Sequence, residues 1–481
     1  MRRLRNLSKS GHVNFNNVTI NDLIQNLPYK FAPYILLPTT LAKLDLLMKP
    51  AIVPSQAQIN YVDALLVLRA IACLMVVVYH CNTNSLLRSS LRYNDIDLSW
   101  LLIPNGLVAV WIFFCLSGYA MGKAFYSGRY SLSRTGVFNF WRNRFLRLAP
   151  LYYFSMIILT VFVYTEMMKI ENWGHLLSVI TFTYPLKFSP LNPPFNSVIW
   201  SLSVEAQFYL TTPLLFSLSH RFCKSQRRIL SAMGCVVVAV FFIKWIVWTA
   251  FSQRIQADIY MAFAYWYTPL VTNLDIFLLG FLINPLLRLK YSHSKNSNLF
   301  GIAITNNLRL WKLVSIGLII GLYLFSSTHL YYAEQWGTWG PDQAATHGIL
   351  TTTSIFILQP LTAGIVSFYI YVFEKDPNPQ PKSSGALVRS TPLPLSWNAI
   401  LQNPMRGFEI LGNLSYGIYL WHTPVLIRIS SLLVQSQPLP NFFLRVKATL
   451  FLSILLSIIT YYTVELPASR LKFYPVKDPV Q

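Results

Sequence analysis

Ten apolar runs, each long enough to cross a lipid bilayer, occupy most of this chain after its first 60 residues. A spanning helix needs about 20 mainly apolar residues, because its backbone rises about 1.5 Å per residue. In hydrocarbon every backbone N–H and C=O must find a partner within the protein, which favours the α-helix for such runs. We therefore predict an all-α, polytopic transmembrane bundle of about ten spanning helices, at residues 64–84, 104–124, 148–166, 198–219, 229–251, 262–287, 311–330, 347–373, 410–434 and 446–466.

The placement of basic residues predicts which side of the membrane each loop occupies. With a cytosolic N-terminus, 29 of the 39 Lys and Arg residues fall in cytosolic segments and seven in external loops. Membrane proteins show this excess of Lys and Arg in their cytosolic loops. Counting the weaker apolar segment 174–190 as a span would move the basic run 221–228 outside. We therefore predict that 167–197 is an external loop and that both termini are cytosolic.

The same pattern predicts the domain organisation. Residues 61–470 are expected to form one membrane domain with a Pro- and Ser-rich cytosolic loop at 374–408. Residues 1–60 are expected to be a basic tail, interfacial or mobile, and 471–481 a cytosolic tail. The net charge of +22 follows from the loop placement, so no nucleic-acid partner is predicted. The five cysteines form no CxxC pair, so neither a disulfide framework nor a metal site is predicted.

Two ionisable residues lie in the first predicted span, where a charge is costly and marks a candidate site. Arg69 and His80 are eleven residues apart, so they share a helix face and are separated by roughly 16 Å along the helix axis. One interpretation is structural: Arg69 snorkels to the cytosolic interface and His80 is a hydrogen-bonded core residue. The other gives this face a fixed cation and, deeper in the membrane, a proton acceptor.

The second and fourth spans add further polar candidates. Ser117 precedes a glycine in the second span, which favours close helix packing and leaves Ser117 able to donate a hydrogen bond to a substrate. The fourth span opens on Trp200, and Ser201, Glu205 and Tyr209 follow at i, i+4 intervals on one stripe. A carboxylate within a membrane needs a cation, a histidine or a substrate hydroxyl beside it, so a functional role is favoured for Glu205.

An arginine cluster comes just before the third span. Arg142, Arg144 and Arg147 lie at the cytosolic end, and the last two are i, i+3 neighbours on one helix face. Guanidinium groups there can bind the phosphates of lipid headgroups, and they can equally bind the phosphates of a nucleotide-bearing ligand. The sequence alone leaves both readings open.

The last two spans also carry polar groups. Ser415, Tyr419 and His422 fall at i, i+4 and i+7 of the ninth span, on one face that is either a packing contact or a pocket wall. Glu465 lies at the cytosolic end of the tenth span, where we expect an exposed residue with an ion-pair partner.

Six motifs occur in a fixed order between residues 60 and 470. They are Arg69 with His80, FFCLSGY at 113–119, the arginine cluster, WSLSVEAQFYL at 200–210, LSYGIYLWHTP at 414–424 and VELP at 464–467. Together they resemble the integral-membrane acyltransferase-3 family, whose members O-acylate bacterial surface polysaccharides and related glycosides. The resemblance covers almost the whole chain outside the N-terminal tail.

The resemblance implies an enzyme of a bacterial inner membrane that takes an acyl group, expected to be acetyl, from cytosolic acyl-CoA. The group would pass to a hydroxyl of a carbohydrate or glycolipid acceptor, with acyl-CoA as co-substrate and no cofactor. The four arginines would bind donor phosphates, and other polar residues would line the pocket. These sets are Arg69, Arg142, Arg144 and Arg147 for the donor, and Trp200, Ser201, Tyr209, Ser415, Tyr419 and His422 for the pocket.

Within that scheme His80 is the expected general base, or alternatively a nucleophile that carries the acyl group covalently. Ser117 could stabilise the oxyanion. The family commonly has an acid in the run before FFCLSGY, and here Trp111 stands in its place. If that acid supports the histidine, another partner is needed, and Glu205 is the candidate.

Three other functions also occur among polytopic membrane proteins. A transporter or flippase of a lipid-linked saccharide would often show internal repeats, and none is evident. A polysaccharide polymerase or ligase would need a large external loop with basic residues, whereas the loop 167–197 holds only Lys169 and Lys187. The unrelated membrane-bound O-acyltransferases use an Asn and a His on late segments, and the Arg69–His80 pair in the first span argues against them.

Overall fold

The computed structural model describes residues 62–82, 90–183, 195–257, 259–289, 307–332, 353–375, 403–430, 432–433 and 437–473. In these ranges the chain is helical, apart from an antiparallel pair of two-residue strands, β1 (Arg92–Tyr93) and β2 (Ile96–Asp97). The ten longest helices in this described part are α4 (Ala64–Cys81), α5 (Gly106–Tyr126), α6 (Arg134–Phe162), α8 (Trp200–Phe222), α9 (Gln226–Ala257), α11 (Leu274–Arg288), α13 (Leu308–Tyr331), α14 (Gln359–Glu374), α16 (Met405–Ser430) and α17 (Pro438–Thr460).

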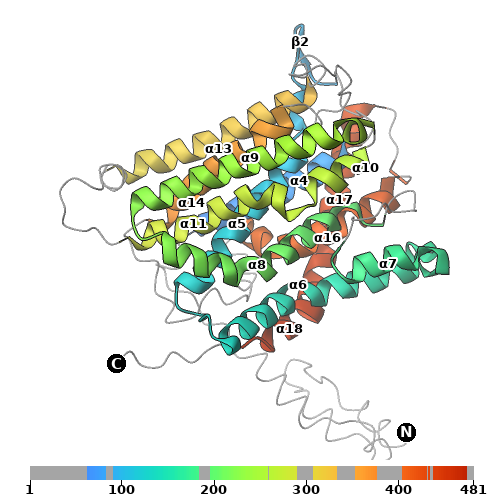
Figure 1. Cartoon of the computed structure of the whole chain (residues 1–481). Helices are drawn as coiled ribbons and strands as arrows, with labels where there is room; N and C mark the ends of the chain where they lie inside the picture. Colours follow the sequence, from blue (N-terminus) through green and yellow to red (C-terminus); the bar gives the residue numbers. More distant parts are fainter. Residues whose placement is uncertain are drawn as a thin grey trace, which may run out of the picture. The chain divides into compact units, whose positions relative to one another are not determined.

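Shorter helical pieces connect them. They are α7 (Trp173–Ile180), α10 (Ile259–Ala262), α18 (Leu466–Arg470), and the 3₁₀ and π turns η5 (Ser99–Leu102), η6 (Thr165–Met168), η7 (Ile170–Asn172), η8 (Ser197–Ile199), η9 (Phe263–Tyr267), η10 (Leu270–Asn273), η11 (Thr353–Leu358) and η12 (Tyr461–Glu465). Helices α9, α11, α14 and α13 run side by side, and α4 packs against α5, α16 and α17 (Figure 1).

Each of the ten predicted spans coincides with one of the long helices, so the predicted α-helical membrane bundle is confirmed. By length and apolar content alone, eight helices in the described ranges could cross a membrane. The two long helices that fall short are α8 and α16, because they carry the polar stripes of the fourth and ninth spans. The segment 165–180 forms only η6, η7 and α7, each too short to cross.

Helices α4 and α16 run in the same direction, which bears on the number of crossings. Along α4, Leu66 faces Gly412, Arg69 bonds to Ser415 and His80 bonds to His422, so residue numbers rise together on both helices. Seven long helices separate the two in the chain. If each of the seven crosses the bilayer, the ninth span is parallel to the first, as observed. Leaving α8 out would make α16 antiparallel to α4.

Small residues allow α5 and α11 to pack closely. A Cβ at Gly118 would overlap the carbonyl oxygen of Phe277, and a Cβ at Gly280 would overlap the carbonyl oxygen of Cys115. Gly122, one helical turn after Gly118, faces the Asn284 side chain and the Phe281 carbonyl oxygen of α11. Membrane helices commonly use such small-xxx-small spacing for close backbone approach. The sequence predicted a packing role for Ser117-Gly118, and in the structure Gly118 has this role.

Prolines inside two helices free backbone carbonyls that then join elements around the site. Pro213 has no N–H to bond the Tyr209 carbonyl in α8, and Trp141 Nε1 of α6 donates to that oxygen at 3.2 Å. Pro424 likewise leaves the Leu420 carbonyl of α16 free, and Asn196 Nδ2 donates to it at 3.0 Å. These bonds hold α6, α8 and α16 in a fixed relation.

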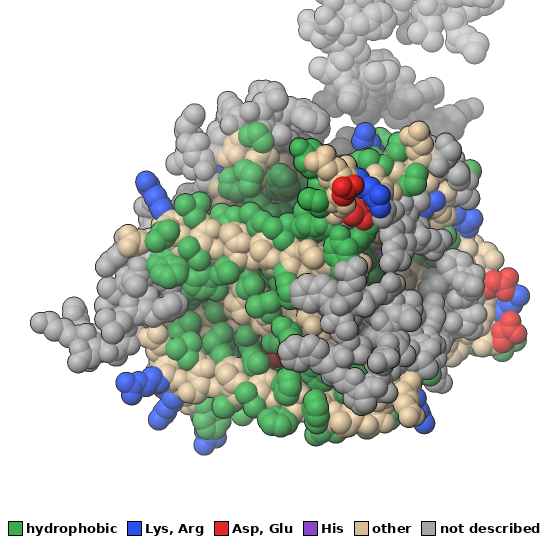
Figure 2. Space-filling model, turned by 90° about the horizontal axis from the view of Figure 1, so that it is seen from above, with side chains coloured by type: hydrophobic (Ala, Val, Ile, Leu, Met, Phe, Trp, Pro, Cys, Tyr) green, Lys and Arg blue, Asp and Glu red, His purple; other side chains and the backbone are tan. Residues whose placement is uncertain are grey.

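Large hydrophobic side chains are exposed along several helices, as expected for a surface that faces lipid. Among them are Phe242, Trp245, Ile246, Leu313, Ile320, Phe451 and Ile459 on α9, α13 and α17. Figure 2 shows hydrophobic side chains over much of the face in view, with Lys and Arg near its edges. The tail 1–60, most of the loop 374–408 and most of 471–481 lie outside the described residues.

Candidate functional site

Helices α4, α5, α6, α8 and α16 surround a cavity of about 140 Å³. Most of the sequence-predicted site residues line it, and they come from five of the six motifs. These residues are Arg69, Ser117, Arg144, Arg147, Ser201, Glu205, Tyr209, Ser415 and Tyr419. Four predicted residues do not line it: His80, Arg142, Trp200 and His422.

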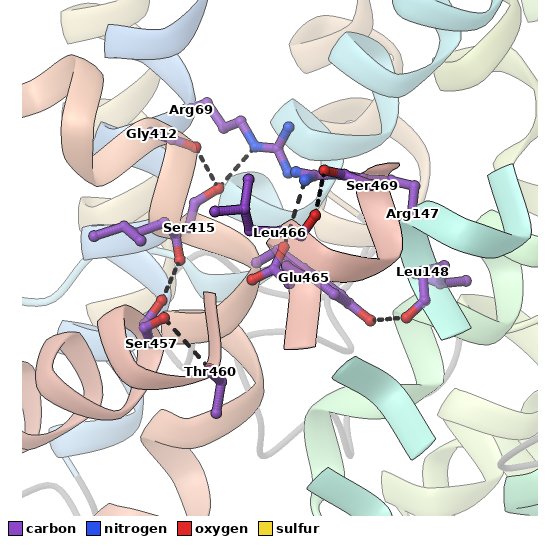
Figure 3. Close-up of polar contacts among 12 residues, drawn as sticks. Arg69, Arg147, Leu148, Gly412, Ser415, Ser457, Thr460, Glu465, Leu466 and Ser469 are labelled. Carbon is purple, nitrogen blue, oxygen red and sulfur yellow. Dashed lines mark hydrogen bonds and ion pairs between the residues drawn. The ribbon is translucent and has the colours of Figure 1, made fainter. Parts of the chain in front are cut away.

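Three arginines supply the positive charge of the cavity. Arg69 Nε donates to Ser415 Oγ at 2.7 Å, and Arg147 Nη1 pairs with Glu465 Oε2 at 3.4 Å. Figure 3 shows Arg69 and Arg147 reaching toward each other from α4 and α6, close enough for their charges to repel. Arg144 lies with its guanidinium carbon 5.6 Å from the Phe140 ring centre, and its Nε has no hydrogen-bond partner among the described residues.

Glu205 is the acidic residue in the cavity lining. Its Oε1 accepts a hydrogen bond from Ser117 Oγ at 2.7 Å and from the Tyr209 hydroxyl at 2.5 Å. Tyr209 reaches Glu205 because the two are i, i+4 on α8. The predicted contact between Glu205 and His80 is wrong: within the described ranges the hydrogen bonds of Glu205 go to these two hydroxyls. Ser117 therefore holds the carboxylate in this structure.

Tyr419 lines the cavity and also contacts one of the two predicted histidines. Its hydroxyl shares a 2.7 Å hydrogen bond with Ser201 Oγ and donates to the Val198 carbonyl at 3.1 Å. Its ring lies 6.0 Å from the Phe113 ring and 5.7 Å from the His422 ring, measured between centres. One side of Tyr419 thus faces the cavity, and the other side faces a histidine pair.

That pair is formed by His80 of α4 and His422 of α16. His422 Nε2 lies 3.2 Å from His80 Nδ1, and the ring centres are 5.1 Å apart. His422 is fully buried, and its Nδ1 lies 2.7 Å from the Tyr419 carbonyl. His80 Nδ1 also lies 2.9 Å from the Val76 carbonyl. Because a carbonyl can only accept, we assign the proton to Nδ1 in both rings.

This assignment determines what each ring can do. His422 Nε2 carries a lone pair and accepts from His80 Nδ1–H, which it shares with the Val76 carbonyl. His80 Nε2 is then unprotonated and makes no hydrogen bond within the described residues. An imidazole nitrogen in that state can accept a proton or attack a carbonyl carbon.

The remaining predicted residues have structural contacts. Arg142 is exposed and its Nη2 donates to the Leu471 carbonyl at 2.8 Å, outside the cavity. Trp200 packs edge-on against Phe114 and Phe263. Glu465 has the expected ion-pair partner in Arg147, but the expectation that it is exposed is wrong, because only 7% of it is accessible. It is buried where α6 packs against η12.

Sequence reasoning missed several residues of this site. Phe113 and Tyr416 line the cavity, and Tyr416 donates to the Leu148 carbonyl at 2.6 Å. Both lie within motifs, beside residues that were selected for polarity. The pairing of His80 with His422 had a partial signal: His80 falls in the outer half, and His422 at the midpoint, of two predicted spans that run in the same direction. Nothing in the sequence indicates that those two spans are neighbours.

Comparison with known proteins decides the family. Residues 60–462, which include the cavity and the histidine pair, match the acyltransferase-3 family, described as an acyltransferase domain. This chain belongs to the acyltransferase-3 family. The resemblance stated from the motifs is thereby confirmed. No solved structure matches the chain.

Relatives of this acyltransferase-3 protein are bacterial. An O-acetyltransferase OatA of Staphylococcus aureus is 23% identical over 435 residues, covering 86% of this chain and 58% of the relative. A peptidoglycan O-acetyltransferase OatA of Listeria monocytogenes is 27% identical over 36% of this chain and 26% of its own length. A putative peptidoglycan O-acetyltransferase YrhL of Bacillus subtilis is 26% identical, over 37% and 27%. The chain thus spans a little over half of the Staphylococcus relative.

Proposed function

We propose that this protein is an integral-membrane O-acyltransferase of a bacterial inner membrane. It moves an acyl group, with acetyl the first to test, from acyl-CoA to a hydroxyl of a cell-envelope carbohydrate. The observation that carries the proposal is a cavity lined by three arginines, together with a histidine pair that contacts the lining residue Tyr419. The printed names of the relatives support acetyl transfer and a peptidoglycan-like acceptor.

The donor fits the charges of the cavity. CoA carries phosphates, and guanidinium groups bind phosphate oxygens through paired N–H donors. Of the three arginines, Arg147 is partly neutralised by Glu465, while Arg144 has no acidic partner in the described part of the chain. The pantetheine arm would then run along α4, where roughly 16 Å separates the levels of Arg69 and His80. An extended pantetheine arm covers a distance of that order.

In the direct route His80 is the general base. His80 Nε2 takes the proton from the acceptor hydroxyl as its oxygen attacks the thioester carbonyl carbon. The carbon–sulfur bond breaks, and the departing thiolate takes the proton from the imidazolium. His422 Nε2 accepts from His80 Nδ1–H throughout and so keeps the basic nitrogen directed at the substrate.

In the covalent route His80 Nε2 itself attacks the thioester carbon, forming an acyl-imidazole as CoA leaves. The acceptor hydroxyl then attacks this acyl carbon and releases the ester and free His80. Both routes need the thioester to reach His80, which does not line the cavity, whereas Tyr419 lines it and has its ring centre 5.7 Å from that of His422. We expect the Tyr419–Ser201 hydrogen bond to open during the reaction.

The decisive experiment measures transfer by purified protein. Wild type and His80→Ala are incubated with radiolabelled acetyl-CoA, with and without envelope glycan, and labelled ester and labelled protein are both counted. Label on the glycan that disappears in the variant supports the proposal, and label on wild-type protein without glycan selects the covalent route. Folded wild type that transfers nothing from acetyl-CoA or other acyl-CoAs would refute it in favour of transport of a lipid-linked saccharide.

A further inference from the structure

The segment Leu471–Phe473, just after α18, is fastened to α6 beside the arginine cluster. Asn143 makes a two-point contact with one residue: its Nδ2 donates to the Phe473 carbonyl at 2.7 Å, and its Oδ1 accepts from the Phe473 N–H at 2.8 Å. Arg142 donates to the Leu471 carbonyl at 2.8 Å. Both side chains precede Arg144 and Arg147, which line the cavity. These hydrogen bonds therefore fix the position of the residue that lies between Leu471 and Phe473.

That residue is Lys472, and it is half-buried. Its charge is close enough to those of Arg147, Arg144 and Arg129 to be repelled by them, and Glu465 is the acid that attracts it. Burial, followed by Arg147 and Arg144, lowers the pKa of the Lys472 ammonium to about 7. Four cationic groups thus lie near one another with a single carboxylate close by. A bound anion would stabilise this arrangement.

We propose that Lys472 is a further phosphate-binding residue of the donor site, held beside the cavity's arginines by the C-terminal segment. The inference rests on the proposed function, because it assigns the anion to the phosphates of CoA. Arg142 and Asn143 act as positioning residues that hold the segment. This gives Arg142 a part in donor binding that its distance from the cavity had seemed to exclude.

The proposal makes donor binding depend on pH with a definite sign. Above pH 7 Lys472 is mostly neutral in the free protein, and a bound phosphate stabilises its charged form. Binding of CoA at pH 8 should therefore take up about one proton, and affinity should fall as the pH rises above 7. Arginine stays charged at these pH values, so Lys472→Arg should bind CoA without that uptake.

Calorimetry on the full chain in neutral-lipid nanodiscs tests this without requiring turnover. CoA and pantetheine, which lacks the phosphates, are titrated at pH 8 in two buffers of different ionisation enthalpy. We expect Lys472→Ala to weaken CoA binding about tenfold and leave pantetheine binding unchanged. Lys472→Arg should retain CoA affinity and lose the proton uptake, and Asn143→Ala should weaken CoA binding in the same selective way.

The outcomes separate the alternatives. Equal weakening of CoA and pantetheine would show that Lys472 only supports the fold, and unchanged CoA binding would overturn the proposal outright. If Lys472→Ala differs from wild type in CoA binding only when anionic lipid is added, Lys472 binds the phosphate of a lipid headgroup. That result would also overturn the proposal. Wild type that binds no CoA refutes the proposed donor, whereas CoA binding that is independent of Lys472 refutes this inference alone.

Discussion

Two backbone carbonyls decide the chemistry available to the histidine pair. The Tyr419 carbonyl fixes a proton on Nδ1 of His422, and the Val76 carbonyl fixes one on Nδ1 of His80. As a result the two rings form a directed chain that ends in an unprotonated Nε2 on His80. Trp111, at the position where the family commonly has an acid, is 1% exposed, and the contact to His80 comes from the neutral imidazole of His422. A neutral partner orients His80 without adding a charge to the membrane interior.

Replacing His422 tests that positioning role. His422→Ala should lower kcat by roughly 10- to 100-fold, a part of the 10²–10⁴ that a general base contributes. The KM for the donor should stay near the wild-type value, because His422 does not line the cavity. His422→Gln offers a carbonyl oxygen to His80 Nδ1–H and should recover part of the rate. A rise in KM at unchanged kcat would contradict the assignment.

Arg144 gives the cleanest test of the donor site. Arg147 pairs with a buried carboxylate, so its removal would also leave Glu465 without its partner. Arg144→Gln removes a charge that has no such partner in the described residues, and the KM for acetyl-CoA should rise about tenfold with kcat little changed. The exposed Arg134, earlier on the same helix, is the matched control, and Arg134→Gln should leave KM unaltered. Equal behaviour of the two variants would count against phosphate binding.

At the scale of elements, the site depends on a few close approaches between helices. Residues of α5 that line the cavity are held in place from behind, where Gly118 and Gly280 bring α5 and α11 into backbone contact. On the other side, the bonds from Trp141 and Asn196 to carbonyls freed by prolines join α6, α8 and α16. Glycine and proline therefore set the distances at which the polar side chains meet.

A methyl group at Gly118 should push α5 and α11 apart. Gly118→Ala places a carbon against the Phe277 carbonyl oxygen, and overpacking of this kind costs about 1–3 kcal/mol. Thermal unfolding in detergent should occur at lower temperature, and activity should fall with it. Gly317→Ala in α13 is the control: open space surrounds that position, so the change should be neutral or stabilising by up to about 1 kcal/mol. Similar melting of both variants would argue against the packing role.

On the scale of the whole molecule, periodicity and length predicted the elements well, but neither predicts neighbours. All ten predicted spans coincide with long helices of the described ranges, because a 20-residue apolar run has few alternatives in a membrane. The candidate residues were found because polar groups are rare there. Which of them touch depends on helix order in space, and the sequence does not encode that order locally. Glu205 was therefore paired with His80 when its partners are Ser117 and Tyr209.

Topology remains a prediction that a labelling experiment can check. In a variant without the five native cysteines, single cysteines are placed at Ser225, between α8 and α9, and at Glu171, in η7. We expect Ser225→Cys to react with an impermeant maleimide only from the cytosolic side and Glu171→Cys only from outside, because α8 separates the two segments and crosses the membrane once. Labelling of both from one side would show that α8 does not cross.

The hydrogen bond between Tyr419 and Ser201 also matters for ion leakage. A cell that keeps a proton gradient across its membrane cannot tolerate a continuous water path through one of its proteins. Tyr419 lines the cavity, its hydroxyl is bonded to Ser201 and to the Val198 carbonyl, and its ring packs against Phe113 and His422. While these contacts are closed, this tyrosine would keep water from passing between the cavity and the histidine pair. If this contact opened only while an acyl group occupied it, the acyl group could pass without letting protons leak across the membrane.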